Sequence, residues 1–408
     1  MTLKLSNIGQ LATYNSRLDR VERLENVEMI LEGTKIASIG KSLPSAHDEI
    51  DVSGCLVTPG FVDAHTHPVF AETREHEFEM RALGKSYKDI AAAGGGIISS
   101  VRTLKALDEG ELSRRVEGRM WDFLRLGTTT LEAKSGYGLS TESELKSLRV
   151  LKRVSESVPV DIVPTFLGAH DFPLEYSDNR SAYVDLVCQE MIPAVADQGI
   201  AEFCDVFCEK GWFSLDDSRR ILTVGVEYGL KPRLHADEFE DSGAASLAAE
   251  MNASSADHLM CVSHDAIALM ARHGVVATLL PGTTFFLGRT RYAPARKFLD
   301  AGVEVALASD FNPGSSMIQS MGFVLSLACL YLGMSVDEAL RAATYGAAKS
   351  VGREKVIGSL EPGKQADLIV WTVRNLAEVP YHVDGNRLYR IIKKGVQVAG
   401  QPSPGREN

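Results

Sequence analysis

The chain has 408 residues, of which 43 are Lys or Arg and 54 are Asp or Glu, so its formal net charge at pH 7 is −11. A binder of nucleic acid or of an anionic membrane surface needs a basic excess, so this charge predicts neither partner. With 45% hydrophobic and 24% charged residues, the composition excludes a disordered or fibrous chain. The length accommodates an α/β barrel of ~250 residues with a smaller second domain.

The sequence predicts a cytoplasmic globular protein. Residues 1–6 show no basic segment followed by an apolar stretch, which a secretory signal would require. The apolar run 321–334 is too short to span a bilayer and predicts a buried helix. Six cysteines in so long a chain predict no disulfide framework.

From residue 57 onward, short apolar segments typical of strands alternate with amphipathic segments typical of helices. Eight strands are predicted, at residues 56–65, 128–134, 161–170, 201–209, 230–238, 254–259, 275–282 and 303–310. Helices are predicted between them, at residues 109–126, 141–157, 181–196, 214–228 and 265–273. Eight alternations favour parallel strands closed into a (β/α)8 TIM-type barrel. An open doubly wound sheet is less favoured, because no Gly-x-Gly-x-x-Gly turn follows the first strand.

The two ends of the chain differ from its middle. Residues 1–56 and 351–408 contain short strand-like pieces between Gly and Pro turns, and neither end has enough apolar residues to bury a core alone. Pairing the two ends predicts a small β-sandwich, with the barrel formed by residues 57–350. The predicted fold class is therefore α/β, a TIM-type barrel with a small β-sandwich domain made from the N- and C-terminal segments.

Polar side chains gather at the predicted carboxyl ends of the strands, the edge at which barrels of this type carry their chemistry. The residues at these ends are His65, His67, Lys134, His170, Glu209, His235, Glu238, His258, Asp310 and Asn312. Because the carboxyl ends of parallel strands meet at one face of a barrel, we expect these side chains to surround one site.

His65 and His67 are two residues apart on a strand and therefore project to the same side, where two imidazoles can bind one ion. His235 and Asp310 add a third nitrogen and a hard oxygen from distant strands. This set predicts one divalent metal ion, zinc or iron, with an open position for water. Buried histidines that are each hydrogen-bonded in the core are the alternative interpretation.

Three side chains are candidates for catalysis beside the ion. Asp310 can both bind the ion and accept a proton from the metal-bound water. His258 can polarise a carbonyl or transfer a proton. The alternative is a histidine that is hydrogen-bonded to other site residues and does not contact the substrate. Glu238 lies three residues after His235 and can bind an N–H of a substrate, unless it is a solvated acid at a helix start.

Longer strings carry a resemblance to known families. Residues 60–67 (GFVDAHTH), with His235, His258 and Asp310, resemble the metal-dependent amidohydrolase superfamily. Further strings resemble the imidazolonepropionase family, at 67–70, 74–78, 84–87, 93–97, 132–138, 166–170, 235–238 and 309–314. The resemblance implies a homodimeric hydrolase that opens 4-imidazolone-5-propanoate to N-formimidoyl-L-glutamate in histidine degradation. A metal-activated water would attack the ring carbonyl, and the cyclic C–N bond would break.

The resemblance also implies which residues bind this substrate. They are Arg74, Tyr87 and Tyr137 for the propionate, and His170, Glu238 and Asn312 for the ring. A guanidinium beside two phenols suits the geometry of a carboxylate. As alternatives, Arg74 would form a surface ion pair with a neighbouring glutamate, the tyrosines would be packed core aromatics, and Asn312 would only shape the turn before Pro313.

Lys134 and Glu209 bear on whether a second ion is bound. Superfamily members with two ions usually place a bridging lysine on the fourth strand, whereas Lys134 ends the second predicted strand. Glu209 does end the fourth strand and leaves a second ion open, although the resemblance implies a single one.

Two other functions share parts of this pattern. An aminohydrolase acting on a purine, pterin or similar ring would use the same metal ligands, and the clamp of Arg74, Tyr87 and Tyr137 separates the two activities. A catalytically silent relative that serves as a scaffold would typically have lost metal ligands, whereas this chain retains all four.

Overall fold

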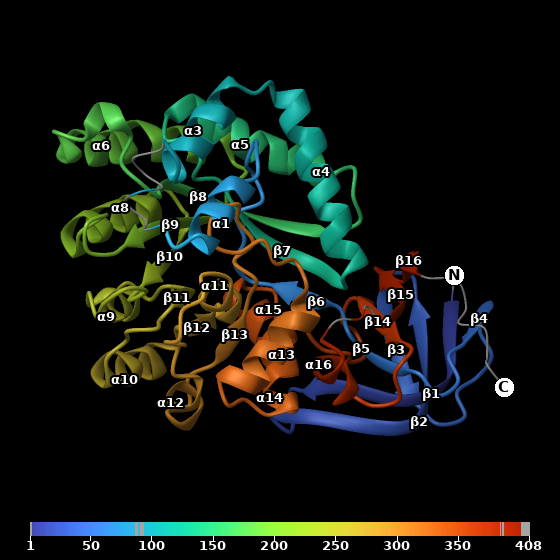
Figure 1. Ribbon diagram of the computed structural model, residues 1–408. Coiled ribbons are helices and arrows are strands. Elements are labelled where there is room, and N and C mark those ends of the chain that lie inside the picture. Colours follow the sequence, from blue (N-terminus) through green and yellow to red (C-terminus); the bar gives the residue numbers. More distant parts are fainter. Residues whose placement is uncertain (1, 86–88, 90–93, 384, 386, 401–408) are drawn as a thin grey trace.

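The chain forms two sheets, one closed into a barrel and one built from both chain ends (Figure 1). The computed structural model describes residues 2–85, 89, 94–383, 385 and 387–400. The barrel sheet contains eight parallel strands in sequence order: β6 (Phe61–Asp63), β7 (Thr128–Lys134), β8 (Asp161–Ala169), β9 (Phe203–Cys208), β10 (Lys231–Ala236), β11 (Ser255–His258), β12 (Val276–Leu279) and β13 (Val305–Leu307). Each of the eight predicted segments contains one of these strands, so the predicted barrel is confirmed.

The apolar segment 56–65 forms two strands where the sequence predicted one. Its first part, β5 (Leu56–Pro59), belongs to the terminal sheet, and β6 starts the barrel after a single intervening residue. That residue, Gly60, packs against Thr129, since a Cβ atom at Gly60 would lie 2.4 Å from the Thr129 hydroxyl. Both strands are fully buried, so a continuous apolar run gave no sign of the change of sheet.

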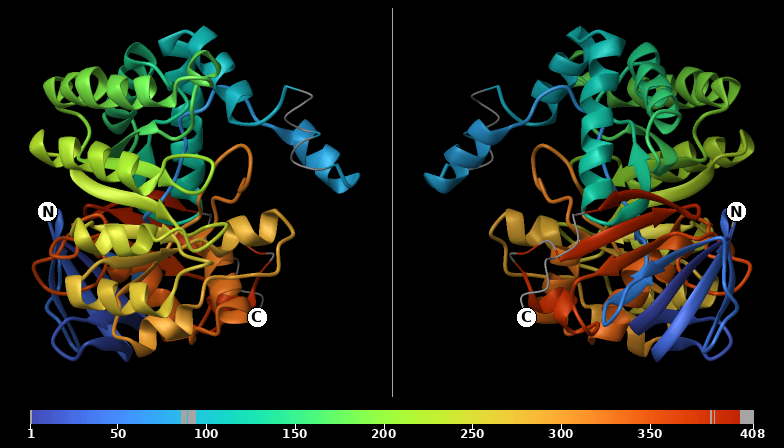
Figure 2. Two further views of the ribbon diagram at one scale, coloured as in Figure 1. Left: turned by 90° about the vertical axis from the view of Figure 1, so that its left-hand side faces the viewer. Right: turned by 90° about the vertical axis from the view of Figure 1, so that its right-hand side faces the viewer.

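Helices surround the barrel on its outer side (Figures 1 and 2). Four predicted helices have ends within two residues of those expected: α4 (Glu109–Arg125), α5 (Thr141–Ser155), α8 (Leu215–Glu227) and α10 (His264–His273). The fifth is divided, because a π-helical turn at Val187–Met191 separates α6 (Arg180–Leu186) from α7 (Ile192–Gln198). The other described α-helices are α1 (Glu75–Ala82), α3 (Ile97–Ala106), α9 (Ala244–Glu250), α11 (Pro281–Phe286), α12 (Ala295–Asp300), α13 (Met321–Tyr331), α14 (Val336–Arg341), α15 (Ala347–Ser350) and α16 (Glu378–Tyr381), with a 3-10 turn at Leu174–Tyr176 and a second π-helical turn at Ala342–Gly346.

Helix α4 shows the local rules that form these elements. Its N-cap, Asp108, accepts hydrogen bonds from the backbone amides of Gly110 and Glu111, at 3.0 and 3.3 Å. Its apolar stripe recurs at three- and four-residue steps and is buried against the barrel. The stripe consists of Leu112, Val116, Met120, Phe123 and Leu124.

The apolar run 321–334 contains the helix α13, most of which is buried, as the sequence predicted. Among the residues that the structure describes, no helix combines the length and the apolar character needed to cross a membrane.

The barrel closes at a seam between its last and first strands. The seam is held by residues just beyond β13 and β6: the Asp310 amide donates to the His65 carbonyl at 3.0 Å, and the His67 amide donates to the Phe311 carbonyl at 2.8 Å. These bonds place three of the four predicted metal ligands side by side.

The second sheet joins the two ends of the chain, whose strands lie beside each other in Figure 2. Its order is β16 (Val396–Gly400), β15 (Leu388–Lys393), β14 (Leu368–Trp371), β5, β1 (Thr2–Asn15), β2 (Arg20–Glu32) and β3 (Lys35–Gly40), and β4 (Asp48–Asp51) pairs with β1. Residues such as Leu5, Met29, Leu368 and Ile392 form a core of its own. The sheet bends around this core, since the Ile36 amide on β3 donates to the Lys364 carbonyl at 2.9 Å.

An ion-pair cluster joins the amino end of the barrel to the terminal sheet. Asp161, the first residue of β8, accepts hydrogen bonds from the ammonium groups of Lys393 and Lys394, each at 2.7 Å. Although burial favours the protonated acid, the two lysines lower the pKa of Asp161 from 3.8 to about 2. The cluster therefore stabilises the fold above pH ~4, and this contribution is lost as the pH falls towards the folded-state pKa.

We expect Asp161→Asn to lower the free energy of unfolding at pH 6 by about 1–2 kcal/mol, a value reduced for solvent screening because the side chain is 36% exposed. The difference between wild type and variant should shrink by roughly half at pH 3, where the unfolded chain already carries a protonated Asp161. Urea unfolding at both pH values measures this. An equal difference at the two pH values would show that the charge of Asp161 does not stabilise the fold.

Candidate metal centre and substrate cavity

A cavity of about 460 Å³ opens at the carboxyl ends of the barrel strands. Of the predicted metal, catalytic and substrate-binding residues, all that the structure describes line this cavity except His65, which is fully buried, and Tyr87 lies outside the described residues. The lining also includes Glu77, Arg81, Lys85, Phe207, Trp212, Phe239 and Arg289.

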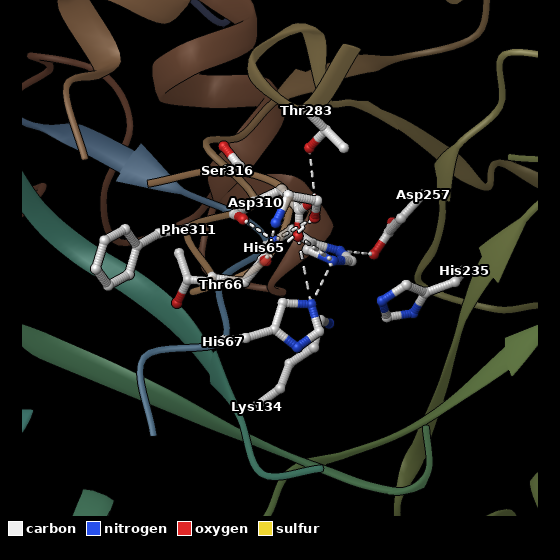
Figure 3. A network of polar contacts seen from close by, with 12 residues as sticks. His65, Thr66, His67, Lys134, His235, Asp257, Thr283, Asp310, Phe311 and Ser316 are labelled. Carbon is white, nitrogen blue, oxygen red and sulfur yellow. Dashed lines mark hydrogen bonds and ion pairs between the residues drawn. The ribbon is translucent and has the colours of Figure 1, made fainter. Parts of the chain in front are cut away.

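His65, His67 and Asp310 direct their side chains to one point (Figure 3). The Nε2 atoms of His65 and His67 are 3.2 Å apart, and Oδ1 of Asp310 lies 3.5 and 3.4 Å from them, respectively. Ligand atoms ~2.1 Å from a tetrahedral ion are ~3.4 Å from one another, so these three atoms have the spacing of a metal site.

His235 and His258 face the same point from neighbouring strands. The ring centroids of His65 and His235 are 4.6 Å apart, and those of His235 and His258 are 5.3 Å apart. One group of ligand atoms within 4.8 Å of one another comes from His65, His67 and Asp310, and another comes from His65, His235 and His258. The structure thus brings the four predicted ligands together around His65 and adds His258 as a further nitrogen.

Buried carboxylates hold the outer nitrogens of two of these histidines. His65 donates from Nδ1 to Asp257 at 2.7 Å, and His235 donates from Nδ1 to Asp205 at 3.1 Å. Because an ionised carboxylate can only accept, each bond assigns the proton to Nδ1 and leaves the Nε2 lone pair free. Carboxylates behind metal-binding histidines act in this way.

Each carboxylate is paired in turn with a fully buried cation. Arg233 lies 3.3 Å from Asp257, and the Lys134 ammonium lies 2.7 Å from Asp205. Although burial opposes ionisation, His235 and Lys134 hold the pKa of Asp205 well below its usual value. Asp205 therefore stays ionised inside the barrel, where an unpaired charge would be costly, and Asp257 has the buried guanidinium of Arg233 as its partner.

Burial keeps His65 and His67 neutral and suits them to a metal ion. Desolvation, together with Lys134 and the neighbouring imidazoles, holds the pKa values of His65 and His67 well below the usual one. Nε2 of His65, whose lone pair is free, lies 3.2 Å from Nε2 of His67 and 3.5 Å from Oδ1 of Asp310. Acceptors that face one another repel, and a divalent cation between them removes that repulsion, so the residues present fit the predicted ion.

Lys134 and Glu209, the two residues that bear on a second ion, are both engaged by the protein. The Lys134 ammonium is bonded to Glu132 at 2.8 Å as well as to Asp205. One oxygen of Glu209 accepts from the backbone amides of Glu238 and Phe239, at 2.8 and 3.0 Å. Glu209 thereby anchors the loop that carries Glu238.

We expect Asp205→Asn to weaken zinc binding by about 10- to 100-fold, the usual effect of removing a carboxylate behind a metal-binding histidine. An asparagine carries no charge to hold the Nδ1 proton of His235, whereas Lys134 keeps its bond to Glu132. Competition with a chromophoric chelator measures the affinity. Asp185→Asn, on the surface, is the matched control, and equal affinities for the two variants would contradict the assigned role of Asp205.

Glu238 and His258 face each other, with 3.7 Å between the carboxylate oxygen and Nε2. Burial, with Asp310 and Glu209 nearby, raises the pKa of Glu238 to about 8. Burial lowers the pKa of His258 to about 3. At neutral pH the pair therefore consists of a protonated acid and a neutral imidazole. The acid can donate a proton and the imidazole can accept one.

Arg74 lies in the cavity wall and forms an ion pair with the buried Glu77. Its Nε and Nη2 donate to the two oxygens of Glu77, at 2.9 and 2.8 Å, and the two side chains are only 10% and 1% exposed. Gly314 packs against the guanidinium, where a Cβ atom would lie 2.6 Å from Nη1. An ion pair with a neighbouring glutamate is thus present, but it lies inside the cavity and not on the surface.

A buried glutamate shapes the loop that carries Tyr137. Glu144 accepts from the backbone amides of Gly136 and Gly138, at 2.9 and 2.7 Å. His170 donates from Nδ1 to the Gly136 carbonyl at 2.9 Å, and its ring centroid is 5.3 Å from that of Tyr137. Burial raises the pKa of Tyr137, so its phenol stays protonated and can donate a hydrogen bond.

The side-chain amide of Asn312 is used within its own turn. Its nitrogen donates to the Asp310 carbonyl at 2.7 Å, and its oxygen accepts from the amides of Gly314 and Ser315, at 2.9 and 2.7 Å. These bonds fix the turn that follows Asp310.

Sequence reasoning missed several residues that build the site. The partners of the predicted side chains that were not foreseen include Glu144, Asp205, Arg233, Asp257 and Thr283, whereas Glu77 was foreseen only as one of three glutamates that could pair with Arg74 on the surface. A signal existed for Arg233, which precedes His235 by two residues in a strand and so shares its inner face. Glu77 and Glu144 lie in the first turns of helices, where acids are common for other reasons.

Comparison with known sequences finds close relatives over most of the chain. A profile of the amidohydrolase family matches residues 233–398. An imidazolonepropionase of Geobacillus thermodenitrificans is 46% identical over 394 residues, which cover 94% of this chain and 93% of that protein. An imidazolonepropionase of Geobacillus kaustophilus is 51% identical over 346 residues, which cover 85% of this chain and 81% of that protein.

Solved structures share the fold at low identity. A variant atrazine chlorohydrolase from Arthrobacter aurescens, complexed with zinc and atraton, is 17% identical with a TM-score of 0.71 and covers 100% of this chain and 97% of that chain. A Xaa-Pro dipeptidase with bound methionine is 15% identical with a TM-score of 0.72 and covers 98% and 100%, respectively. These likenesses support the fold, a barrel with a β domain made from both chain ends.

Proposed function

The chain belongs to the imidazolonepropionase family, and on this premise we propose how its cavity opens the ring of 4-imidazolone-5-propanoate to give N-formimidoyl-L-glutamate. The reaction is the hydrolysis of a cyclic amide C–N bond in histidine degradation. Water adds across this bond, so that the carbonyl carbon gains a hydroxyl group and the ring nitrogen gains a proton.

One observation carries the proposal: a metal-ligand cluster and the largely covered guanidinium of Arg74, 10% exposed, share one cavity. Gly314, four residues after Asp310, packs against Arg74, so a single turn connects the two features. The substrate has a carbonyl to be polarised at one end and a carboxylate at the other, which matches these two features.

We propose that one ion, zinc or iron, is held by His65, His67, His235 and Asp310. When bound, it would polarise the ring carbonyl and lower the pKa of water towards neutrality. The engagement of Lys134 and Glu209 by other residues supports one ion over two.

Asp310, Glu238 and His258 divide the proton transfers in this proposal. Asp310 accepts a proton from the attacking water. Glu238, whose pKa is raised to about 8, donates a hydrogen bond or proton to the ring nitrogen that departs. His258, a neutral imidazole 3.7 Å from Glu238, relays the proton taken up by Asp310 to Glu238 between turnovers, so that Glu238 starts each turnover protonated.

The remaining residues bind the substrate. Arg74, Tyr87 and Tyr137 clamp the propionate, and His170 presents Nε2 to an N–H of the ring. For Asn312 the internal bonds of its amide favour the role of fixing the turn beside Asp310 over direct binding of the ring.

The proposal is tested by removing metal with a chelator and restoring zinc or iron in steps while ring opening is followed through formation of N-formimidoyl-L-glutamate. We expect activity to disappear and to return fully at one equivalent of metal. Release of ammonia from a purine or pterin, without ring opening of the imidazolone, would assign the site to an aminohydrolase. A purified protein that binds neither zinc nor iron and is inactive would indicate a scaffold.

We also propose that the protein is a homodimer in the cytoplasm, as the family resemblance implies. Light scattering on the purified chain at micromolar concentration tests the oligomeric state, with twice the mass of one chain as the expected result. A single-chain mass across the concentration range would contradict it.

A further inference from the structure

Thr283 forms a short hydrogen bond with Asp310 on the side of the carboxylate away from the histidines (Figure 3). Its hydroxyl donates to Oδ2 of Asp310 at 2.5 Å. Both residues are buried, with exposed fractions of 1% and 3%. A bond of this length from a hydroxyl to a carboxylate is at the strong end of charge-assisted hydrogen bonds.

The two oxygens of Asp310 therefore have different partners. Oδ1 faces Nε2 of His65 and of His67, at 3.5 and 3.4 Å, whereas Oδ2 is taken by Thr283. Rotation of the carboxylate about its last bond would exchange the two oxygens. The Thr283 hydroxyl opposes that rotation.

The backbone of Asp310 is already fixed by other bonds. Its amide donates to the His65 carbonyl at 3.0 Å, and its carbonyl accepts from the Asn312 side chain at 2.7 Å. Its φ of +52° is unusual for a residue with a side chain and persists because the surrounding bonds hold it. With the backbone fixed, the orientation of the carboxylate is the main freedom left, and Thr283 restricts it.

Thr283 is itself held rigidly. It lies in the short helix α11, which starts at Pro281, two residues after β12 ends. A β-branched side chain has few χ1 rotamers, so a buried threonine presents its hydroxyl in a defined direction.

We propose that Thr283 is a positioning residue for Asp310. Its hydroxyl orients the carboxylate so that Oδ1 points to the metal position and to the water that Asp310 is to deprotonate. The inference rests on the proposed function, because it assumes that Asp310 binds the catalytic ion.

Three substitutions separate the hydroxyl from the shape of the side chain. Thr283→Val and Thr283→Ala remove the hydroxyl, and Thr283→Ser retains it. Thr284→Val is the matched control, because Thr284 is the next residue of the same helix and is equally buried at 1% exposure. Zinc affinity is measured by chelator competition, and kcat and KM are measured by imidazolone ring opening.

We expect the Val and Ala variants to bind zinc about tenfold more weakly and to lose about tenfold in kcat with KM changed less than about twofold, as loss of a support behind a metal ligand predicts. The Ser variant and the Thr284→Val control should match wild type within about twofold. Circular dichroism and thermal unfolding of the metal-free proteins check the fold. If the Val variant folds poorly, the comparison is made with the Ala variant.

The inference is overturned if wild type binds one zinc ion and the Ala variant matches it in affinity and kcat, a result that leaves the proposed function intact. A loss confined to Val also overturns it, because the added methyl group and not the missing hydroxyl would then be the cause. A wild-type protein that binds no zinc or iron would refute the proposed metal site itself.

Discussion

Replacing Asp310 with asparagine is expected to lower kcat for imidazolone ring opening by about 10³- to 10⁴-fold. The substitution keeps the size of the side chain and a possible bond to Thr283, but it removes the charged ligand oxygen 3.4–3.5 Å from His65 and His67. It also removes the group proposed to accept the proton of the attacking water. Steady-state kinetics with the metal content of each sample measured in parallel gives the result.

The metal measurement distinguishes the two roles of Asp310. A variant that retains one ion and still loses activity shows the loss of the proton acceptor, whereas a variant without metal shows the loss of the ligand. Asp300→Asn, at an exposed surface position, is the control and should retain full activity. A variant at Asp310 with more than a tenth of wild-type kcat would refute its place in the site.

Removing the guanidinium of Arg74 is expected to raise KM for 4-imidazolone-5-propanoate by about 10- to 100-fold. This range corresponds to the binding free energy of a hydrogen bond between charged groups. The sharp test is the double variant Arg74→Met with Glu77→Gln, because Glu77 is 1% exposed and would otherwise keep only Arg81, 4.0 Å away, as a cationic partner. We expect the single Arg74→Met variant to lose, in addition, about 1.5–3 kcal/mol of stability, because Glu77 then keeps only the more distant Arg81 and the Gly96 amide.

A matched control exists on the surface, where Arg149 pairs with Glu109 at 2.9 Å with both side chains at least a third exposed. The double variant Arg149→Met with Glu109→Gln should leave KM unchanged. If the Arg74 and Glu77 double variant also leaves KM unchanged, the propionate must be held by another cation of the cavity, such as Arg81, Lys85 or Arg289.

The barrel was predictable because its strands are short, buried and separated by amphipathic helices, and each strand obeys a local pattern. The convergence of His65, His235 and Asp310 followed from the same topology, since parallel strands place their carboxyl ends on one face. What no local pattern could show is the change of sheet at Gly60, which depends on contact with Thr129 from a distant strand.

The inner layer of the barrel was only partly predictable. Lys134 was identified as a strand-end residue, but its partners Glu132 and Asp205 were not, although Glu132 lies two residues before it on the same inner face. Buried strands of parallel sheets usually contain apolar residues. A charged residue within such a strand must therefore have a partner, but the sequence does not show which of the other buried charged residues it pairs with. Only the assembled barrel shows which carboxylate meets which cation.

Pairing of the two chain ends in one sheet also sets an order of events in time. Val57 of β5 pairs with Val370 of β14, so the central strand pair of the terminal sheet needs residues about 300 positions apart. At a synthesis rate of ~5–20 residues per second, β5 waits ~15–60 s for its partner while the barrel is being made. During that interval the edge of β5 is open to pairing with other chains, so the ribosome-bound form exposes an edge that β14 covers in the folded protein.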